Sequence, residues 1–99
     1  NFNFQKDLKY RTRITWLFAL LVKNGKRDLL IKKLKENGLD ARPFFHVLSD
    51  MDIYKKYSNA PTPCAIEISK KGLNLPTYES LKSLDQIQSI IDKVLKGPL

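Results

Sequence analysis

Very few side chains in this sequence can bind a metal or act as a nucleophile. Among 99 residues there is one cysteine, Cys64, and one histidine, His46. A single cysteine excludes an internal disulfide and a multi-cysteine metal site, and a single histidine excludes a histidine pair on a metal. We therefore expect no metal site and no catalytic residue in this chain. Such sparse use of cysteine favours the reducing cytoplasm.

Long apolar runs and glycine-rich loops are also missing. The longest apolar stretch covers only Trp16 to Val22, whereas a membrane span needs about 18 such residues, so we expect no membrane segment. No glycine-rich pattern of the kind that cradles a phosphate occurs. The chain shows no signal-peptide pattern. Because it begins at Asn1 rather than methionine, we expect it to be a fragment.

Acidic residues are outnumbered, with 10 Asp and Glu against 18 Lys and Arg and a net charge of +8. Such an excess can indicate a nucleic-acid surface. The basic residues are spread along the chain, however, and pairs such as Lys70-Lys71 end predicted helices, where they complement the helix dipole. A solvated basic surface is therefore favoured. A stand-alone basic binding module for nucleic acid or another polyanion stays open as the alternative.

Three extended segments are predicted where aromatic and branched side chains lie between turn residues. Their ranges are about 15–23, 40–47 and 73–75. Pro43 lacks a donor for the strand ladder and is expected at a sheet edge.

Helices are predicted from apolar residues three and four positions apart. Their ranges are 26–37, 63–71 and about 83–96, with a short helical turn between 49 and 57. Gly38 fits the left-handed residue that ends the first helix, and Thr62 is expected to cap the second. Ser83 and Gln86 have the spacing of a capping box at the third.

These elements predict an α+β two-layer sandwich of about three strands with helices packed on one face. The predicted domain covers residues 14–99. Residues 1–13 are polar and basic with scattered aromatics, and we interpret them as a linker or arm from a larger parent chain. A domain of this size can bury one core.

Few polar residues are candidates for binding. Arg42 begins a predicted strand beside a proline and two phenylalanines, where a guanidinium can bind phosphate or carboxylate; a surface ion pair explains it equally well. His46 is expected to be structural, and Cys64 to be a small buried side chain in helix 63–71. Phe44 and Phe45 are expected mostly in the core, with a stacking wall for a base or sugar ring as the minority alternative.

Five motifs, in a fixed order and spacing, carry a family resemblance. They are Trp16 to Leu21, Leu30 to Gly38, Ala41 to Phe45, Met51 to Tyr54 and Ile68 to Pro76. Together they resemble the C-terminal end of the DegT/DnrJ/EryC1/StrS sugar aminotransferases, and most of all the branch that includes GDP-perosamine synthase. The resemblance covers about 14–96.

The resemblance implies a fold and a chemistry. Members have a large domain that binds pyridoxal 5′-phosphate on a lysine and a small C-terminal α+β domain. As homodimers they transfer an amino group, usually from glutamate, to a keto group on a nucleotide-linked sugar. This chain resembles the small domain alone. The cofactor lysine and phosphate site would therefore lie in the missing large domain, and this segment by itself is expected to be inactive.

Matched by position, Arg42 corresponds to the arginine of the family's Thr-Arg-Pro pattern and Phe45 to the aromatic near the active-site mouth. His46 to Ser49 stand where many members have Tyr-Pro-Leu-His, so that Ser49 replaces the family's frequent histidine. Asp52 replaces the usual proline before the hydrophobic-tyrosine step. The resemblance thus implies four candidate substrate-binding residues: Arg42, Phe45, His46 and Ser49. It implies no cofactor-binding residue in this segment.

A third hypothesis is an interaction domain whose bare face packs on the missing large domain. A domain separated from such a partner is expected to expose an apolar patch.

Overall fold

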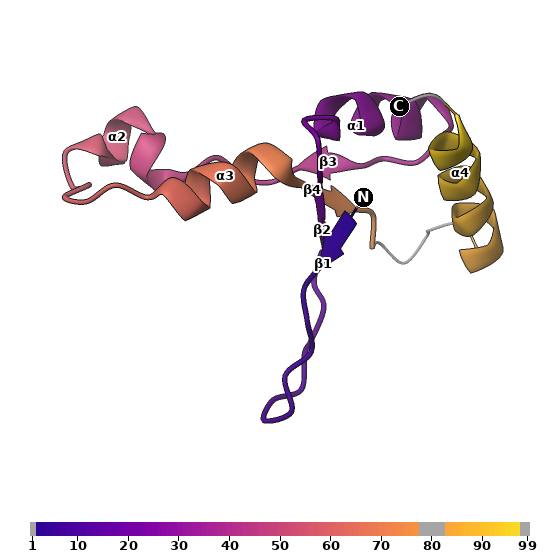
Figure 1. Cartoon of the computed structure of the whole chain (residues 1–99), viewed down its shortest axis with the longest axis horizontal. Coiled ribbons are helices and arrows are strands. Elements are labelled where there is room, and N and C mark those ends of the chain that lie inside the picture. The colour runs from indigo at the N-terminus through magenta and orange to yellow at the C-terminus, as the bar shows by residue number, and fades with distance from the viewer. Residues whose placement is uncertain (1, 78–82, 98–99) are drawn as a thin grey trace.

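The computed structural model describes residues 2–77 and 83–97 and confirms an α+β fold (Figure 1). In chain order its elements are β1 (Phe2–Phe4), β2 (Phe18–Val22), α1 (Arg27–Glu36), β3 (Arg42–Pro43), the 3₁₀ turn η1 (Leu48–Asp50), α2 (Asp52–Lys55), α3 (Pro63–Lys71), β4 (Gly72–Leu75) and α4 (Leu84–Lys96). The helix ranges agree closely with those predicted, because each helix has a clear apolar period and defined ends.

The strands form one antiparallel sheet in the order β1-β2-β4-β3. Leu73 of β4 is opposite Leu20 of β2 on one side and Pro43 of β3 on the other. Pro43 therefore lies in an edge strand, as predicted, where its missing donor costs no ladder bond.

Two strand predictions need correction. In the part of the chain that the structure describes, the sheet has four strands rather than about three, because the segment predicted as a linker or arm at 1–13 begins with β1, which pairs with β2. Three residues are too few to show a strand period in the sequence. The strand expected at 40–47 is reduced to β3, because the backbone leaves the sheet after Phe44, whose N–H donates to the carbonyl of Gly72 at 3.1 Å.

The hydrophobic core lies between the sheet and helices α1 and α4. Its buried members are Leu20, Val22, Leu30, Leu34, Leu39, Ala41, Leu73 and Val94. Leu30 and Leu34 are one helical turn apart, which explains why α1 buries this face. Gly38 follows α1 with φ of +83°, so its left-handed role is confirmed.

The structure confirms the predicted side-chain cap on α4 but not a side-chain cap on α3. The hydroxyl of Ser83 accepts from the N–H of Gln86 at 3.4 Å, which confirms a cap on α4. Thr62 occupies the N-cap position of α3, with Pro63 as the first helical residue, as predicted. Its side chain makes no capping bond, however, because its hydroxyl pairs with the hydroxyl of Ser49 at 2.7 Å.

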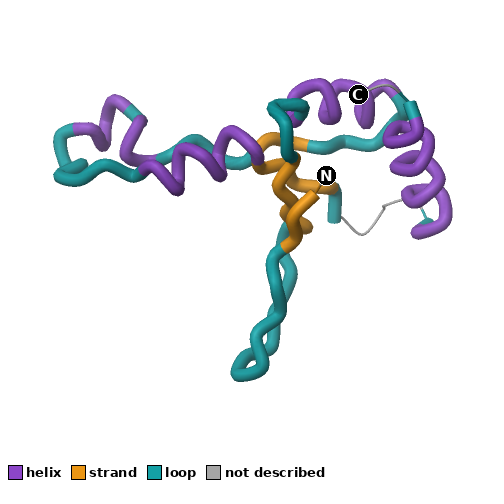
Figure 2. The backbone as a smooth tube through the Cα atoms, viewed as in Figure 1, coloured by secondary structure: helices purple, strands orange, loops and turns teal. Residues whose placement is uncertain are grey.

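Two extensions project from this body (Figures 1 and 2). Residues 5–17, called the arm below, run out from β1 and return to β2. Residues 44–71, called the wing, carry η1, α2 and α3 away from the sheet. Among the described helices, α1 and α4 therefore form the layer on the sheet.

The extensions leave the chain with an open surface. Its radius of gyration is 15.6 Å, against about 13 Å for a compact domain of this length. Its accessible surface is 8017 Å², whereas a compact protein of this mass exposes about 5,800 Å². Much of the wing and arm thus lacks a covering layer.

Candidate functional site

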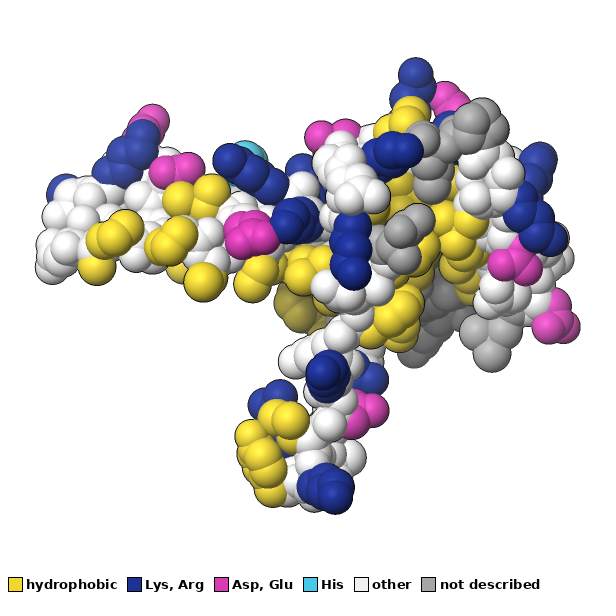
Figure 3. Space-filling model, in the orientation of Figure 1, with side chains coloured by type: hydrophobic (Ala, Val, Ile, Leu, Met, Phe, Trp, Pro, Cys, Tyr) yellow, Lys and Arg dark blue, Asp and Glu magenta, His cyan; other side chains and the backbone are white. Residues whose placement is uncertain are grey.

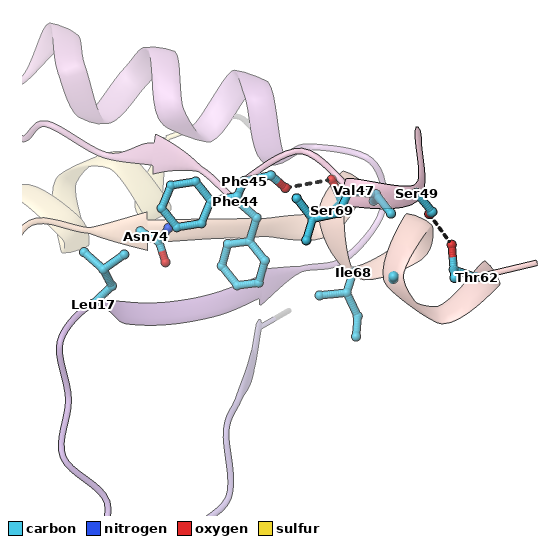
Figure 4. Close-up of a pocket in the computed structure, with 11 residues that line it drawn as sticks. Leu17, Phe44, Phe45, Val47, Ser49, Thr62, Ile68, Ser69 and Asn74 are labelled. Atoms are coloured by element: carbon cyan, nitrogen blue, oxygen red, sulfur yellow. Dashed lines mark hydrogen bonds between the residues drawn. The ribbon is translucent and has the colours of Figure 1, made fainter. Parts of the chain in front are cut away.

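A largely apolar groove of about 630 Å³ runs along the wing, where the segment after β3 lies beside α3 (Figure 4). We call it the wing groove. Its walls include Phe44, Phe45, Val47, Ala65 and Ile68. Three of its polar side chains make hydrogen bonds within the chain: Ser49 pairs with Thr62, and the hydroxyl of Ser69 donates to the carbonyl of Phe45 at 3.4 Å. Asn74 is a further polar residue in its lining. The groove therefore offers mainly apolar contact.

A second cavity, of about 540 Å³, shares Phe45 with the wing groove. We call it the arginine cavity. It is lined by Trp16, Asp40, Arg42, Asn74 and Thr77 together with Phe45. The rings of Trp16 and Phe45 are stacked, with centroids 6.5 Å apart and planes inclined by 22°. This cavity thus combines an aromatic surface with charged and polar groups.

Arg42 is exposed and paired with Asp40. Its Nε donates to Asp40 Oδ2 at 3.0 Å, and Lys35 Nζ lies 3.8 Å from the other carboxylate oxygen. The surface ion pair considered from the sequence is therefore present. Exposed pairs of this kind contribute only about 0.2–1 kcal/mol to stability.

The structure brings together only part of the predicted site. Arg42 and Phe45 line the arginine cavity, and Phe45 and Ser49 line the wing groove. His46 is exposed and lines neither.

Two burial expectations are wrong. Phe45 is exposed rather than in the core, and Cys64 is an exposed free thiol rather than a buried side chain. Both lie on the wing, which has no layer packed over it. Trp16 was not among the predicted site residues, because in the sequence it stands only at the beginning of a predicted strand.

The wing is fastened to the body by Arg27 at the start of α1. Its guanidinium donates to the carbonyls of Ser69 at 3.1 Å and Gly72 at 2.9 Å, and its side chain is only 16% exposed. The last carbonyls of a helix have no partner within the helix. Arg27 therefore caps α3 from another element and sets the direction of the wing.

Replacing Arg27 with methionine is expected to lower the free energy of unfolding by about 1.5–3 kcal/mol, because two partly buried carbonyls lose a charged donor. Urea unfolding measures this loss. In the matched control Arg11→Met, on the exposed arm, little change is expected. Equal stability of the two variants would show that Arg27 does not hold the wing.

Basic residues do not gather into one patch on the face shown in Figure 3. Ion pairs bind Arg13 to Asp7, Lys55 to Asp52 and Lys71 to Glu67 on three separate elements, and Lys and Arg are dispersed over the view in Figure 3. The hydrogen bond and charge of Lys71 hold the pKa of Glu67 below its ordinary value. This distribution gives no support to a nucleic-acid interface.

Neither metal ligation nor membrane insertion is indicated in the described ranges. Residues 2–77 and 83–97 contain no group of three His, Cys, Asp or Glu side chains placed to hold a metal ion. In those same ranges, every helix is too short or too polar to cross a bilayer.

Known proteins resemble this chain in sequence and in fold. GDP-perosamine synthase from Caulobacter vibrioides is 30% identical over 87 residues, covering 83% of this chain and 24% of that protein. The structure of Helicobacter pylori PseC, an aminotransferase involved in the biosynthesis of pseudoaminic acid, matches with a TM-score of 0.64 and 24% identity, over 81% of this chain and 22% of that one. The chain thus spans about a quarter of the length of these relatives.

The match to PseC concerns the fold, and the family is established by sequence. The DegT/DnrJ/EryC1/StrS aminotransferase family model matches residues 2–95. Both the family and the GDP-perosamine synthase branch expected from the motifs are confirmed. This chain belongs to the DegT/DnrJ/EryC1/StrS aminotransferase family.

Proposed function

We propose that this chain is the small C-terminal domain of a pyridoxal phosphate-dependent aminotransferase that acts on a nucleotide-linked sugar. Family membership supports transamination, and the perosamine synthase relative supports a nucleotide-sugar acceptor. We take glutamate as the amino donor, a homodimer as the assembly and the cytoplasm as the compartment, where the free thiol of Cys64 would stay reduced.

The described residues do not fit the cofactor itself. Pyridoxal phosphate is bound as a Schiff base on a lysine amine. Neither the wing groove nor the arginine cavity has a lysine in its walls. Lys23 and Lys71 line a separate polar depression, in which Lys71 is paired with Glu67. We therefore propose that the cofactor is held by the large domain, and we assign no catalytic residue among the described residues.

The observation that carries this proposal is the uncovered apolar surface of the wing and arm. Trp16, Phe45, Ile53 and Ile68 are exposed, and Figure 3 shows apolar side chains gathered along the wing and at the end of the arm. Exposed patches of this kind mark interaction surfaces. The proposed role is to close over a cofactor-bearing large domain and exclude water from its reaction, with Arg42, Phe45, His46 and Ser49 as the proposed substrate-binding residues.

A hybrid enzyme tests the proposal. The part of the Caulobacter GDP-perosamine synthase that matches this chain, 24% of that protein, is replaced by this chain, and amino transfer from glutamate is measured. We expect the hybrid to be active and the same enzyme without its C-terminal part to be inactive, because the chain supplies the missing cover. A hybrid that folds and binds cofactor but transfers nothing would contradict the proposal.

The isolated chain is the control in this experiment. With pyridoxal phosphate it is expected to show neither amino transfer nor the visible absorbance of a lysine-bound cofactor. Strong cofactor binding that disappears when the lysines are acetylated would place the cofactor site inside this chain instead.

A further inference from the structure

We propose that Arg27 is a positioning residue for the amino transfer: it fixes the angle at which the wing leaves the sheet, and so the angle at which the wing meets the large domain. The inference rests on the proposed function, because it assigns a task within that same enzyme. Arg27 lies on α1 and acts through the wing alone, without contacting substrate or cofactor.

The two halves of the wing root meet at one backbone carbonyl. The carbonyl of Gly72, where α3 passes into β4, accepts from the N–H of Phe44 at 3.1 Å and from Nη1 of Arg27 at 2.9 Å. A carbonyl oxygen has two lone pairs and can hold both donors. Phe44 begins the outgoing half of the wing, and Gly72 follows the end of the returning half. Arg27 therefore binds the point at which both halves join the sheet.

The two halves are also tied to each other along the wing. Nη1 of Arg27 donates to the carbonyl of Ser69 at 3.1 Å, and the hydroxyl of that same serine donates to the carbonyl of Phe45 at 3.4 Å. Farther from the sheet, the hydroxyls of Ser49 and Thr62 pair at 2.7 Å (Figure 4). Because these bonds join the halves at two places, we expect the wing to turn about its root as one unit.

The guanidinium of Arg27 is itself held in place. Its side chain is 16% exposed, and its Nε lies 2.6 Å from Oδ1 of Asp28. Nε makes no hydrogen bond to any described residue, so this contact is an ion pair rather than a directed bond. Nη1 carries two hydrogens and meets two carbonyls. A planar guanidinium sets the angle between two such bonds, whereas an ammonium on a flexible stem does not.

A small rotation at the root becomes a large displacement along the wing, which projects far from the sheet (Figure 1). Helix α3 has 9 residues and is therefore about 13 Å long. A turn of about 10° at its root moves the far end of such a helix by about 2 Å. A misplacement of about 1 Å can slow an enzyme about 100-fold. The angle set by Arg27 is therefore expected to matter where the wing meets the large domain.

A purely stabilising role is the competing explanation for Arg27. It predicts that any substitution with a similar loss of stability has a similar effect on activity. Leu34→Val supplies the comparison, because Leu34 is 2% exposed on the core side of the same helix and its truncation destabilises the domain through the core. A positioning role predicts that the Arg27 variants alone change the angle of the wing.

The first test uses two probes that the chain already carries. Cys64 is its single cysteine and is exposed on α3, and Trp16 is its single tryptophan, whose carbonyl accepts from the hydroxyl of Thr77 at 2.7 Å. A fluorescent acceptor attached to Cys64 reports energy transfer from Trp16, and the fluorescence decay gives the mean distance and its spread. Circular dichroism checks that each labelled variant is folded.

We expect Arg27→Met to broaden the distribution of distances between Trp16 and the label, because the wing root loses both bonds to Nη1. Arg27→Lys keeps the charge near the end of α3 but not the planar donor, so its distribution is expected to lie between those of the parent and Arg27→Met. Leu34→Val is expected to give the distribution of the parent.

The hybrid enzyme supplies the second readout. In it, Arg27→Met is expected to lower kcat by about tenfold or more, and Arg27→Lys is expected to recover part of that loss. The absorbance of the bound cofactor is expected to stay unchanged in both, because the proposed cofactor site lies in the large domain. Leu34→Val, measured at the same temperature, is expected to keep the kcat of the parent.

Two results would overturn the inference: an unchanged distribution of distances in Arg27→Met, or equal losses of kcat in Arg27→Met and Leu34→Val. Failure of the proposed function looks different. An inactive hybrid with the unaltered chain contradicts the aminotransferase role, while energy transfer in the chain alone still decides whether Arg27 sets the angle of the wing. An active hybrid that is indifferent to Arg27→Met removes only the positioning role.

Discussion

Replacing Leu73 with alanine is expected to lower the free energy of unfolding by about 2–5 kcal/mol, the range for truncation of a fully buried leucine. Leu73 is 0% exposed and lies in β4 between Leu20 and Pro43, where the sheet meets α1 and α4. Its loss leaves a cavity that strands on both sides prevent from collapsing. Small domains have about 5–15 kcal/mol of stability in total, so much of the chain would unfold in mild urea.

Leu48→Ala is the matched control for this prediction. Leu48 is 65% exposed on the wing, so the same truncation there removes little buried area. We expect its urea midpoint to stay close to that of the parent, within about 0.5 kcal/mol. If both substitutions shift the midpoint equally, the core does not lie where the structure places it.

The second large effect is expected for Gly72→Ala. A Cβ at this position would lie 2.2 Å from Cδ2 of Phe44, well inside contact distance. Gly72 has φ of −80°, which alanine adopts freely, so the effect is steric and not conformational. Phe44 would have to move, at a cost of about 1–3 kcal/mol. Because Phe44 is a wall of the wing groove, the groove would change shape as well.

Gly97→Ala and a double variant complete this test. At Gly97 the nearest atom to an added Cβ is 3.6 Å away, so alanine fits there and stability should not fall. Adding Phe44→Ala to Gly72→Ala removes the collision, and we expect the pair to cost less than the sum of the two single changes. Additive losses would mean that the two side chains do not meet.

Sequence periodicity predicted the helices well because their signals are local. Leu30 and Leu34 identify the buried face of α1, and Gly38 identifies its end. The sheet was harder, since β1 and β3 contain three and two residues and exist only through their pairing partners. Thr62 shows that a side-chain hydrogen bond can also depend on residues distant in sequence. Its hydroxyl pairs with that of Ser49, 13 positions earlier in the chain, and makes no capping bond to α3.

The candidate site was only partly predicted, because some of its residues meet only through contacts between distant parts of the chain. Arg42 and Phe45 stand in a motif whose spacing is visible in the sequence, and both line the arginine cavity. Trp16 reaches Phe45 only through the fold, so no local pattern links them. Cys64 and Phe45 were assigned to the core because an amphipathic or aromatic segment is normally covered, and the wing is not.

Phe45 forms a wall of both the wing groove and the arginine cavity. One ring therefore takes one rotamer at a time for both hollows. An occupant of either hollow that fixes this ring also fixes it for the other, so two occupants would be thermodynamically linked through one side chain. By reciprocity, an apolar contact in the groove changes the affinity of the cavity by the same factor as the cavity's ligand changes that contact.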